Sequence, residues 1–230
     1  MSHEYPLRRV VKYIVSIAVK PVLVRYLSTT RTYRYRNVVL QVPPEVFHPG
    51  FFFSTKLLLR YLCTLPLRGR RLLELGAGSG LISIVMAQLG SYVVATDINE
   101  TALQQLEANA IANAVALEIR QSDLFNELRG ERFDMIAINP PYFKGTPRSE
   151  REYAWYCGPA GEYFARLFRQ LEDHIYPHSE VLMVLSDGCD REMIAAHAAA
   201  AGFRMQCVLR RPNLMETNFI YRIEKMVHDA

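Results

Sequence analysis

The feature that most constrains the fold of this sequence is a regular alternation of short apolar runs with amphipathic segments between residues 70 and 202. The apolar runs have the length of strands, and most are separated by helical patterns of about 10–15 residues. We expect strands at residues 70–76, 91–97, 116–123, 133–142 and 180–186, and helices at residues 80–90, 99–113, 161–176 and 190–202. Because a helix between two strands lets the chain cross over the sheet, the pattern predicts a doubly wound, mostly parallel α/β sheet.

The C-terminal segment adds two strands of a different kind. Residues 203–211 and 216–225 both have strand patterns, but the few residues between them leave no room for a crossover helix. These two strands must therefore be antiparallel. We predict a Rossmann-like sheet of seven strands, mostly parallel with a C-terminal antiparallel hairpin, in a main domain that spans residues 46–230.

Residues 1–45 form a basic extension of this domain. Within residues 1–40, eight Lys and Arg residues oppose a single acid, so this segment carries +7 and the rest of the chain −3 of the net +4. We expect an amphipathic helix that ends near Pro21, then a hairpin or two short strands around Asn37, then a helix from about Ser54 to Leu62 with Ser54 as its N-cap. The charge indicates an anionic partner such as RNA, a ribosome or a membrane surface, although a solvated helix face would carry the same charge.

The composition excludes several other classes of protein. The longest uncharged run of the extension, YIVSIAV, is far shorter than the roughly 20 residues of a membrane span. The four cysteines are scattered without a CxxC pair, which is typical of reduced thiols in a cytoplasmic protein. The histidines show no HExxH motif, and Pro177 interrupts the pair His174 and His178, so no metal site is expected.

A glycine-rich turn follows the first strand of the alternating series. In the segment ELGAGSG, Gly76, Gly78 and Gly80 leave room for a ligand close to the backbone, and the next helix presents its N-terminal N–H groups. The spacing is GxGxG, whereas dinucleotide enzymes have GxGxxG. The carboxylate of Glu74 would repel a pyrophosphate but suits a cationic amino-acid ligand. A plain glycine turn is the alternative interpretation.

Polar residues stand at the carboxyl ends of four successive strands: Glu74, Asp97, Asp123 and Asn139. In an open α/β sheet, ligands bind outside these strand ends. A carboxylate at Asp97 can accept hydrogen bonds from both ribose hydroxyls. Asp123 can accept from an adenine amino group. Any one of these residues could be a helix cap, but four at corresponding positions indicate a ligand site.

The segment Asn139-Pro140-Pro141-Tyr142 ends the fourth strand, because proline cannot donate to a strand ladder. The Asn139 side-chain carbonyl and the Pro140 backbone carbonyl offer two acceptors for a planar –NH₂ group. The Tyr142 ring can stack on that group. A rigid turn is the simpler interpretation, but these residue types also suit the binding of a planar nitrogen substrate.

The motifs LLELGAGSG, ATDIN, SDLF and NPPY, in this order, resemble the class I S-adenosylmethionine-dependent methyltransferases. In that superfamily, NPPY marks enzymes that methylate nitrogen on planar amides or exocyclic amines. The resemblance implies that S-adenosylmethionine is the cofactor. Its predicted contacts are Glu74, Gly76, Gly78, Gly80, Asp97, Ile98, Asp123, Leu124 and Asn139. The resemblance also implies that Asn139, Pro140, Pro141 and Tyr142 bind the substrate, with Asn139, Pro140 and Tyr142 as the catalytic residues.

Both flanks of the core resemble the HemK-related glutamine methyltransferases. Upstream, Phe47, Pro49 and Phe52 correspond to a segment that closes over the cofactor, although phenylalanines here could equally fill the core; His48 is a further candidate contact. Downstream, AWYCGPAGEYF resembles that family's GGxxG element, with Cys157 in place of the first glycine. A macromolecular substrate follows from the resemblance, and a protein glutamine, methylated on N5, is the preferred acceptor.

One alternative concerns the methyl acceptor, and two others concern the activity itself. NPPYF and the Thr-Pro-Arg segment behind it also resemble enzymes that methylate adenosine in tRNA, so an adenine or guanine of tRNA or rRNA is the second acceptor class. A non-catalytic scaffold subunit would predict decay in NPPY or in the glycine-rich turn, and both are intact. A nicotinamide dehydrogenase is disfavoured by GxGxG, by Glu74 and by the NPPY end.

Overall fold

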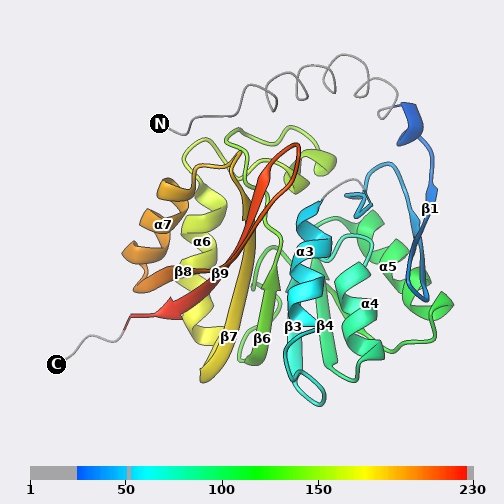
Figure 1. The fold of residues 1–230 in the computed structure, drawn as a ribbon, viewed down its shortest axis with the longest axis horizontal. Helices are drawn as coiled ribbons and strands as arrows, with labels where there is room; N and C mark the ends of the chain where they lie inside the picture. Colours follow the sequence, from blue (N-terminus) through cyan, green and yellow to red (C-terminus); the bar gives the residue numbers. More distant parts are fainter. Residues whose placement is uncertain (1–24, 51–52, 227–230) are drawn as a thin grey trace.

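The computed structural model describes residues 25–50 and 53–226 and contains the predicted seven-stranded sheet (Figure 1). The strand order is β5-β4-β3-β6-β7-β9-β8. Pairing is parallel from β5 through β7 and antiparallel between β7, β9 and β8. The strands are β3 (Arg71–Leu75), β4 (Tyr92–Asp97), β5 (Glu118–Gln121), β6 (Phe133–Ile138), β7 (Ile175–Ser186), β8 (Phe203–Pro212) and β9 (Thr217–Lys225). The predicted Rossmann-like fold is therefore confirmed.

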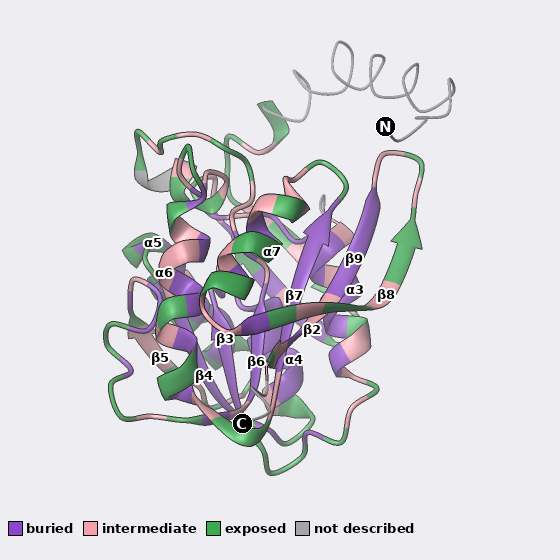
Figure 2. Cartoon of the chain, turned by 90° about the vertical axis from the view of Figure 1, so that its left-hand side faces the viewer, coloured by how far each residue is buried: buried purple, intermediate pink, exposed green. Residues whose placement is uncertain are grey.

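Helices cover both faces of the sheet. One face packs against α3 (Phe53–Leu62), α4 (Leu81–Gln88) and α5 (Glu100–Ala112), and the other against α6 (Glu162–Leu171) and α7 (Arg191–Ala200). Short 3-10 helices span Glu150–Ala154 and Glu172–His174. The central strands β3, β4 and β6 are mostly buried between these layers, whereas the edge strand β8 and the outer helix faces are largely exposed (Figure 2). This arrangement explains why the central strands read as nearly continuous apolar runs.

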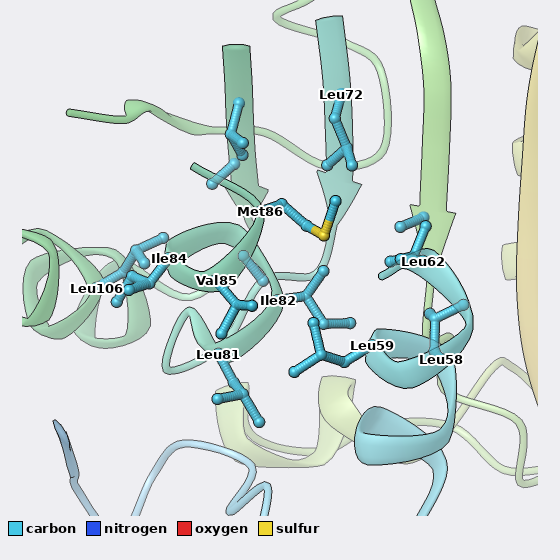
Figure 3. Packing of buried hydrophobic residues seen from close by; sticks show 14 of the residues in the cluster. Leu58, Leu59, Leu62, Leu72, Leu81, Ile82, Ile84, Val85, Met86 and Leu106 are labelled. Carbon is cyan, nitrogen blue, oxygen red and sulfur yellow. The ribbon is translucent and has the colours of Figure 1, made fainter. Parts of the chain in front are cut away.

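The two faces of the sheet each have a buried cluster. In β3, Leu72 belongs to the cluster of α3 and α4, while Leu73 belongs to the cluster of α6 and α7. Successive strand residues point to opposite faces, so one apolar strand serves both clusters. Figure 3 shows the first cluster, where Leu59 and Leu62 of α3 lie near Ile82 and Met86 of α4. These contacts pack α3 and α4 against each other on the same face of the sheet.

The first two strands form an antiparallel hairpin, as predicted, from β1 (Arg31–Tyr35) and β2 (Val38–Val42). Val38, Leu40 and Val42 are buried in the same cluster as α4. This hairpin is therefore packed on the sheet-covering helices. The amphipathic helix predicted before Pro21 lies outside the described residues, and the domain boundary at residue 45 stays a prediction. No helix in the described part of the chain has the length and apolarity required to cross a membrane.

Several element boundaries differ from the sequence predictions, and strand β6 and helix α6 both end earlier than expected, at Ile138 and Leu171. Helix α3 already includes Phe53, so Ser54 lies in its first turn and is not its N-cap. Strand β5 ends at Gln121, because Ser122 turns the chain by donating its hydroxyl to the Leu124 carbonyl (2.8 Å). Strand β7 begins at Ile175, since a register shift opposite β6 accommodates Pro177. None of these shifts moves the strand ends away from one edge of the sheet.

Candidate active site

A cavity at the carboxyl ends of β3, β4 and β6 encloses about 1260 Å³, including open space at its mouth. Its lining includes Glu74, Asp97, Asp123 and Asn139. The sheet thus brings together the four polar residues that the sequence placed at strand ends. Concave sites in which apolar walls surround a few convergent polar groups are typical of small-molecule binding.

The glycine-rich turn forms one wall of this cavity. Gly76 has φ of +72°, and a Cβ built there would meet no atom within 4 Å, so it would project into open space. Gly78 has φ of +53° and lies near Val46. Gly80 does not line the cavity, and a Cβ there would approach the Leu106 side chain to 2.0 Å. The first two glycines therefore keep the wall open to a ligand, while the third permits close packing of α5.

Glu74 is a buried carboxyl beside this turn, with 5% of its surface exposed. Burial raises its pKa to about 8, and hydrogen bonds from Ser83 oppose this shift. Ser83 donates its backbone N–H (2.8 Å) and its hydroxyl to Oε2. Both Ser83 donors bind Oε2, so Oε1 is the oxygen that a cationic ligand can approach.

Asp97 links the end of β4 to the glycine-rich turn. Its Oδ2 accepts from the Gly78 N–H (2.9 Å) and its Oδ1 from the Asn99 N–H (3.0 Å). Burial raises the pKa of Asp97, while these backbone donors lower it. Each carboxylate oxygen retains a second lone pair, so hydroxyl groups can still donate to Asp97. Ile98 lines the cavity beside it, and Asn99 caps α5 by accepting from Thr101 N–H (2.9 Å).

Asp123 lies just beyond β5, with Leu124 next to it in the cavity wall. Arg166 of α6 donates to Asp123 Oδ2 at 2.5 Å, a contact that the sequence did not predict. This pair leaves Asp123 Oδ1 for another donor. Leu124 has φ of +54° and is 6% exposed, so its side chain forms an apolar surface between Asp123 and the core.

Asn139 follows β6 and is held by a residue of α3. Its Nδ2 donates to the Thr55 hydroxyl at 3.1 Å. With Nδ2 directed at the Thr55 hydroxyl, Oδ1 is the end of the amide that is available to accept a further hydrogen bond, in a residue that lines the cavity. Thr55 is 8% exposed and also lines the cavity. It was missed from the sequence because a buried threonine inside a helix gives no signal of function.

Pro140, Pro141 and Tyr142 line the cavity next to Asn139, as predicted for a substrate-binding segment. Burial raises the pKa of Tyr142 to about 12, and its hydroxyl is hydrogen-bonded to Ser186 at the end of β7. The Tyr142 ring therefore has an anchored polar end, and the phenol stays neutral at physiological pH.

Several aromatic rings line the cavity near the segment that follows Asn139. Trp155 lies 5.3 Å from Phe47 and 6.5 Å from Phe143, measured between ring centroids. Phe143 pairs with the segment before Cys157, donating its N–H to the Trp155 carbonyl (2.9 Å). Tyr153 and Tyr163 complete this lining. The sequence signalled Phe47, while the others come together only because residues 143–145 and 155–158 pair in space.

The four candidates on the upstream flank have different positions. Phe47 and Pro49 line the cavity, but Phe52 lies outside the described residues. His48 does not line this cavity; its Nδ1 accepts from the Gly50 N–H (3.1 Å), and its ring packs edge-on against Tyr33. Burial lowers the pKa of His48, which suits this packing role.

Comparison with known proteins shows to which family the chain belongs. Residues 38–155, which are 118 of the 230 residues, match the Methyltransferase small domain family. A protein of Methanocaldococcus jannaschii named "Putative protein N5-glutamine methyltransferase" is 39% identical over 117 residues, 50% of this chain and 55% of that protein. Ribosomal RNA small subunit methyltransferase C of Buchnera aphidicola is 31% identical over 128 residues, 54% of this chain and 39% of that protein. The chain thus spans about half the length of these relatives, or less.

Among solved structures, the E. cuniculi Mtq2–Trm112 complex, which is responsible for methylation of the eRF1 translation termination factor, contains a similar chain. The TM-score is 0.62 at 21% identity, over 79% of this chain and 99% of that chain. At this identity, the likeness shows the fold. Fold, motif order and family match agree: the chain belongs to the Methyltransferase small domain family, and the predicted class, the S-adenosylmethionine-dependent methyltransferases, is confirmed.

Proposed function

We propose that this protein transfers a methyl group to a planar nitrogen, and that the side-chain amide of a protein glutamine is its preferred acceptor. The observation that carries the proposal is the position of Asn139, which lines the cavity with its amide nitrogen bonded to Thr55 and its Oδ1 available as an acceptor. An –NH₂ group is recognised by oriented acceptors, and the amide is oriented before any substrate arrives.

The residues present fit S-adenosylmethionine. When bound, this cofactor supplies an electrophilic methyl group on a sulfonium sulfur. Gly76 and Gly78 would leave room for its methionine part, with Glu74 opposite the ammonium group. Asp97 would accept from the ribose hydroxyls, and Asp123 Oδ1 from the adenine amino group, with Leu124 against the ring. The open space beyond the Gly76 Cα supports this assignment, because a side chain there would fill it.

The substrate segment would act mainly by positioning. Asn139 Oδ1 and the Pro140 carbonyl would accept the two N–H groups of the acceptor, which increases electron density on a nitrogen whose lone pair is delocalised. The rings around the cavity would exclude water and hold the acceptor plane. Tyr142, with its pKa near 12, cannot serve as a base at neutral pH. As the methyl group moves from sulfur to nitrogen, the cofactor would become S-adenosylhomocysteine, and the methylated nitrogen would lose its proton to solvent.

The preference for glutamine is supported by the 39% identity to the M. jannaschii protein and by the HemK-like motifs on both flanks. A nucleobase is the second candidate acceptor, favoured by one observation. Phe143 and Tyr153 are 40% and 46% exposed at the cavity, and exposed rings of this kind stack on bases. Arg34 and Arg36 of the β1–β2 hairpin are also exposed and could contact phosphates.

The test is transfer of a labelled methyl group from S-adenosylmethionine to a cell extract, followed by treatment with protease or ribonuclease. Label released by protease would support a protein acceptor. Label released by ribonuclease would contradict a protein acceptor and support RNA as the acceptor. The Asn139→Ala variant is the control, because it should bind the cofactor and transfer nothing. No label in either fraction, with intact cofactor binding, would refute a macromolecular acceptor.

A further inference from the structure

Asn109 of α5 and Asn113, the residue that caps the C-terminal end of this helix, hydrogen-bond to the backbone of β2 as a neighbouring strand would. Asn113 accepts from the Val39 N–H (3.0 Å) and donates to the Val39 carbonyl (2.7 Å). Asn109 accepts from the Gln41 N–H (2.8 Å) and donates to the Gln41 carbonyl (3.0 Å). Four helical residues rise about 6.0 Å and two strand residues about 6.7 Å, so the two amides match alternate residues along the strand edge.

The two asparagines differ in one further contact. Asn109 Nδ2 also donates to the carbonyl of Ser79, at 3.0 Å, inside the glycine-rich turn. The corresponding second bond of Asn113 goes to the Asn109 carbonyl within its own helix (2.7 Å). Asn109 is 2% exposed, and its Oδ1 also accepts from Gln105 (3.2 Å), so both ends of its amide make two hydrogen bonds. Only Asn109 of this pair joins the hairpin, α5 and the cofactor wall.

The glycine-rich turn needs such an anchor. Gly76, Gly78 and Gly80 all have positive φ, and glycine loses more conformational freedom on ordering than any other residue. Helix α5 contacts the turn at two adjacent points, through Asn109 at Ser79 and through Leu106 at Gly80. Figure 3 shows Leu106 beside Ile84 of α4, the helix that the turn begins.

We propose that Asn109 is a positioning residue that holds the glycine-rich turn in its S-adenosylmethionine-binding conformation and ties it to the β1–β2 hairpin. This inference rests on the proposed function, because it takes the turn as a cofactor wall. Without the Ser79 contact, the turn populates other conformations, and the apparent dissociation constant rises by the inverse of the binding-competent fraction.

The first experiment compares Asn109→Ala with Asn113→Ala, using calorimetric titration of the full chain with S-adenosylmethionine. Both variants lose two hydrogen bonds to β2, so a general loss of stability affects both. We expect Kd to rise about tenfold in Asn109→Ala, the effect of one buried hydrogen bond, and less than about twofold in Asn113→Ala. Equal dissociation constants in the two variants would overturn the proposal.

The second experiment needs no cofactor. Hydrogen exchange of the peptide covering residues 74–83, measured in the cofactor-free protein, should be faster in Asn109→Ala than in Asn113→Ala. Exchange at the same rate in both would show that Asn109 does not hold the turn. Should Asn109→Ala fail to fold, Asn109→Asp keeps the size of the side chain but loses the donor to both Ser79 and Gln41. Its control is Asn113→Asp, which loses the donor to Val39 and has no contact with the turn. If the wild-type protein does not bind S-adenosylmethionine, the proposed function is refuted. The hydrogen-exchange experiment still tests whether Asn109 holds the turn, because it uses no cofactor.

Discussion

Glu74 should release a proton when S-adenosylmethionine binds. Its carboxyl is buried beside the glycine-rich turn, and its pKa is raised from 4.5 to about 8. The free protein therefore holds Glu74 mostly protonated at pH 6.5. A cofactor ammonium close to this carboxyl would favour the ionised form and lower its pKa toward the ordinary value.

The size of the effect follows from these two values. With a pKa of about 8, roughly 97% of Glu74 is protonated at pH 6.5, so nearly one proton should leave for each cofactor bound. Below pH 8, the affinity should rise by up to about tenfold for each pH unit, because one pKa unit corresponds to about 1.36 kcal/mol. Above pH 8, this dependence should disappear.

Calorimetric titration at pH 6.5 in two buffers with different ionisation enthalpies measures the proton count directly. Glu74→Gln is the matched control, since it keeps the size of the side chain and cannot ionise. Wild-type protein should show close to one released proton and the Gln variant none. A count near zero in the wild type, or the same count in both, would refute the assigned contact between Glu74 and the ammonium group.

Four further outcomes are expected. As the pH rises from 4.5 to about 8, the free energy of unfolding should fall by up to about 1.4 kcal/mol per pH unit, because the folded protein keeps the Glu74 proton that the unfolded chain releases. In Glu74→Gln, denaturant titrations should show a smaller change of this free energy with pH. Thr55→Val should lower the transfer rate about tenfold with cofactor affinity unchanged, whereas Thr55→Ser retains the hydroxyl and should stay near wild type in a single-turnover assay. Asp97→Ala should weaken cofactor binding at least tenfold by calorimetry, since the change also frees Gly78, and unchanged affinity would contradict its role. Charge reversal of Arg34 and Arg36 should weaken binding to RNA but not methylation of a protein acceptor, and a filter-binding titration that shows no change would exclude the hairpin as an RNA contact.

Much of the fold was determined by local patterns in the sequence. The alternation of strands and helices, the closeness of the last two strands and the Asn99 cap each depend on residues near one another in the chain. Parallel strands also place their carboxyl ends at one edge, so Glu74, Asp97 and Asn139 could be predicted to meet without knowing any side-chain contact. The order of the motifs was sufficient to predict the family.

The tertiary structure decided the contacts between distant segments. Thr55 reaches Asn139 across 84 positions and Asn109 reaches Gln41 across 68, and neither residue type is unusual at its own position. The Arg166 bond to Asp123 depends in the same way on how α6 packs against the sheet. Periodicity shows which face of a helix is buried, because burial repeats with the turn of the helix. It does not show which polar group a buried side chain will meet, because that partner is chosen by the packing of whole elements against each other.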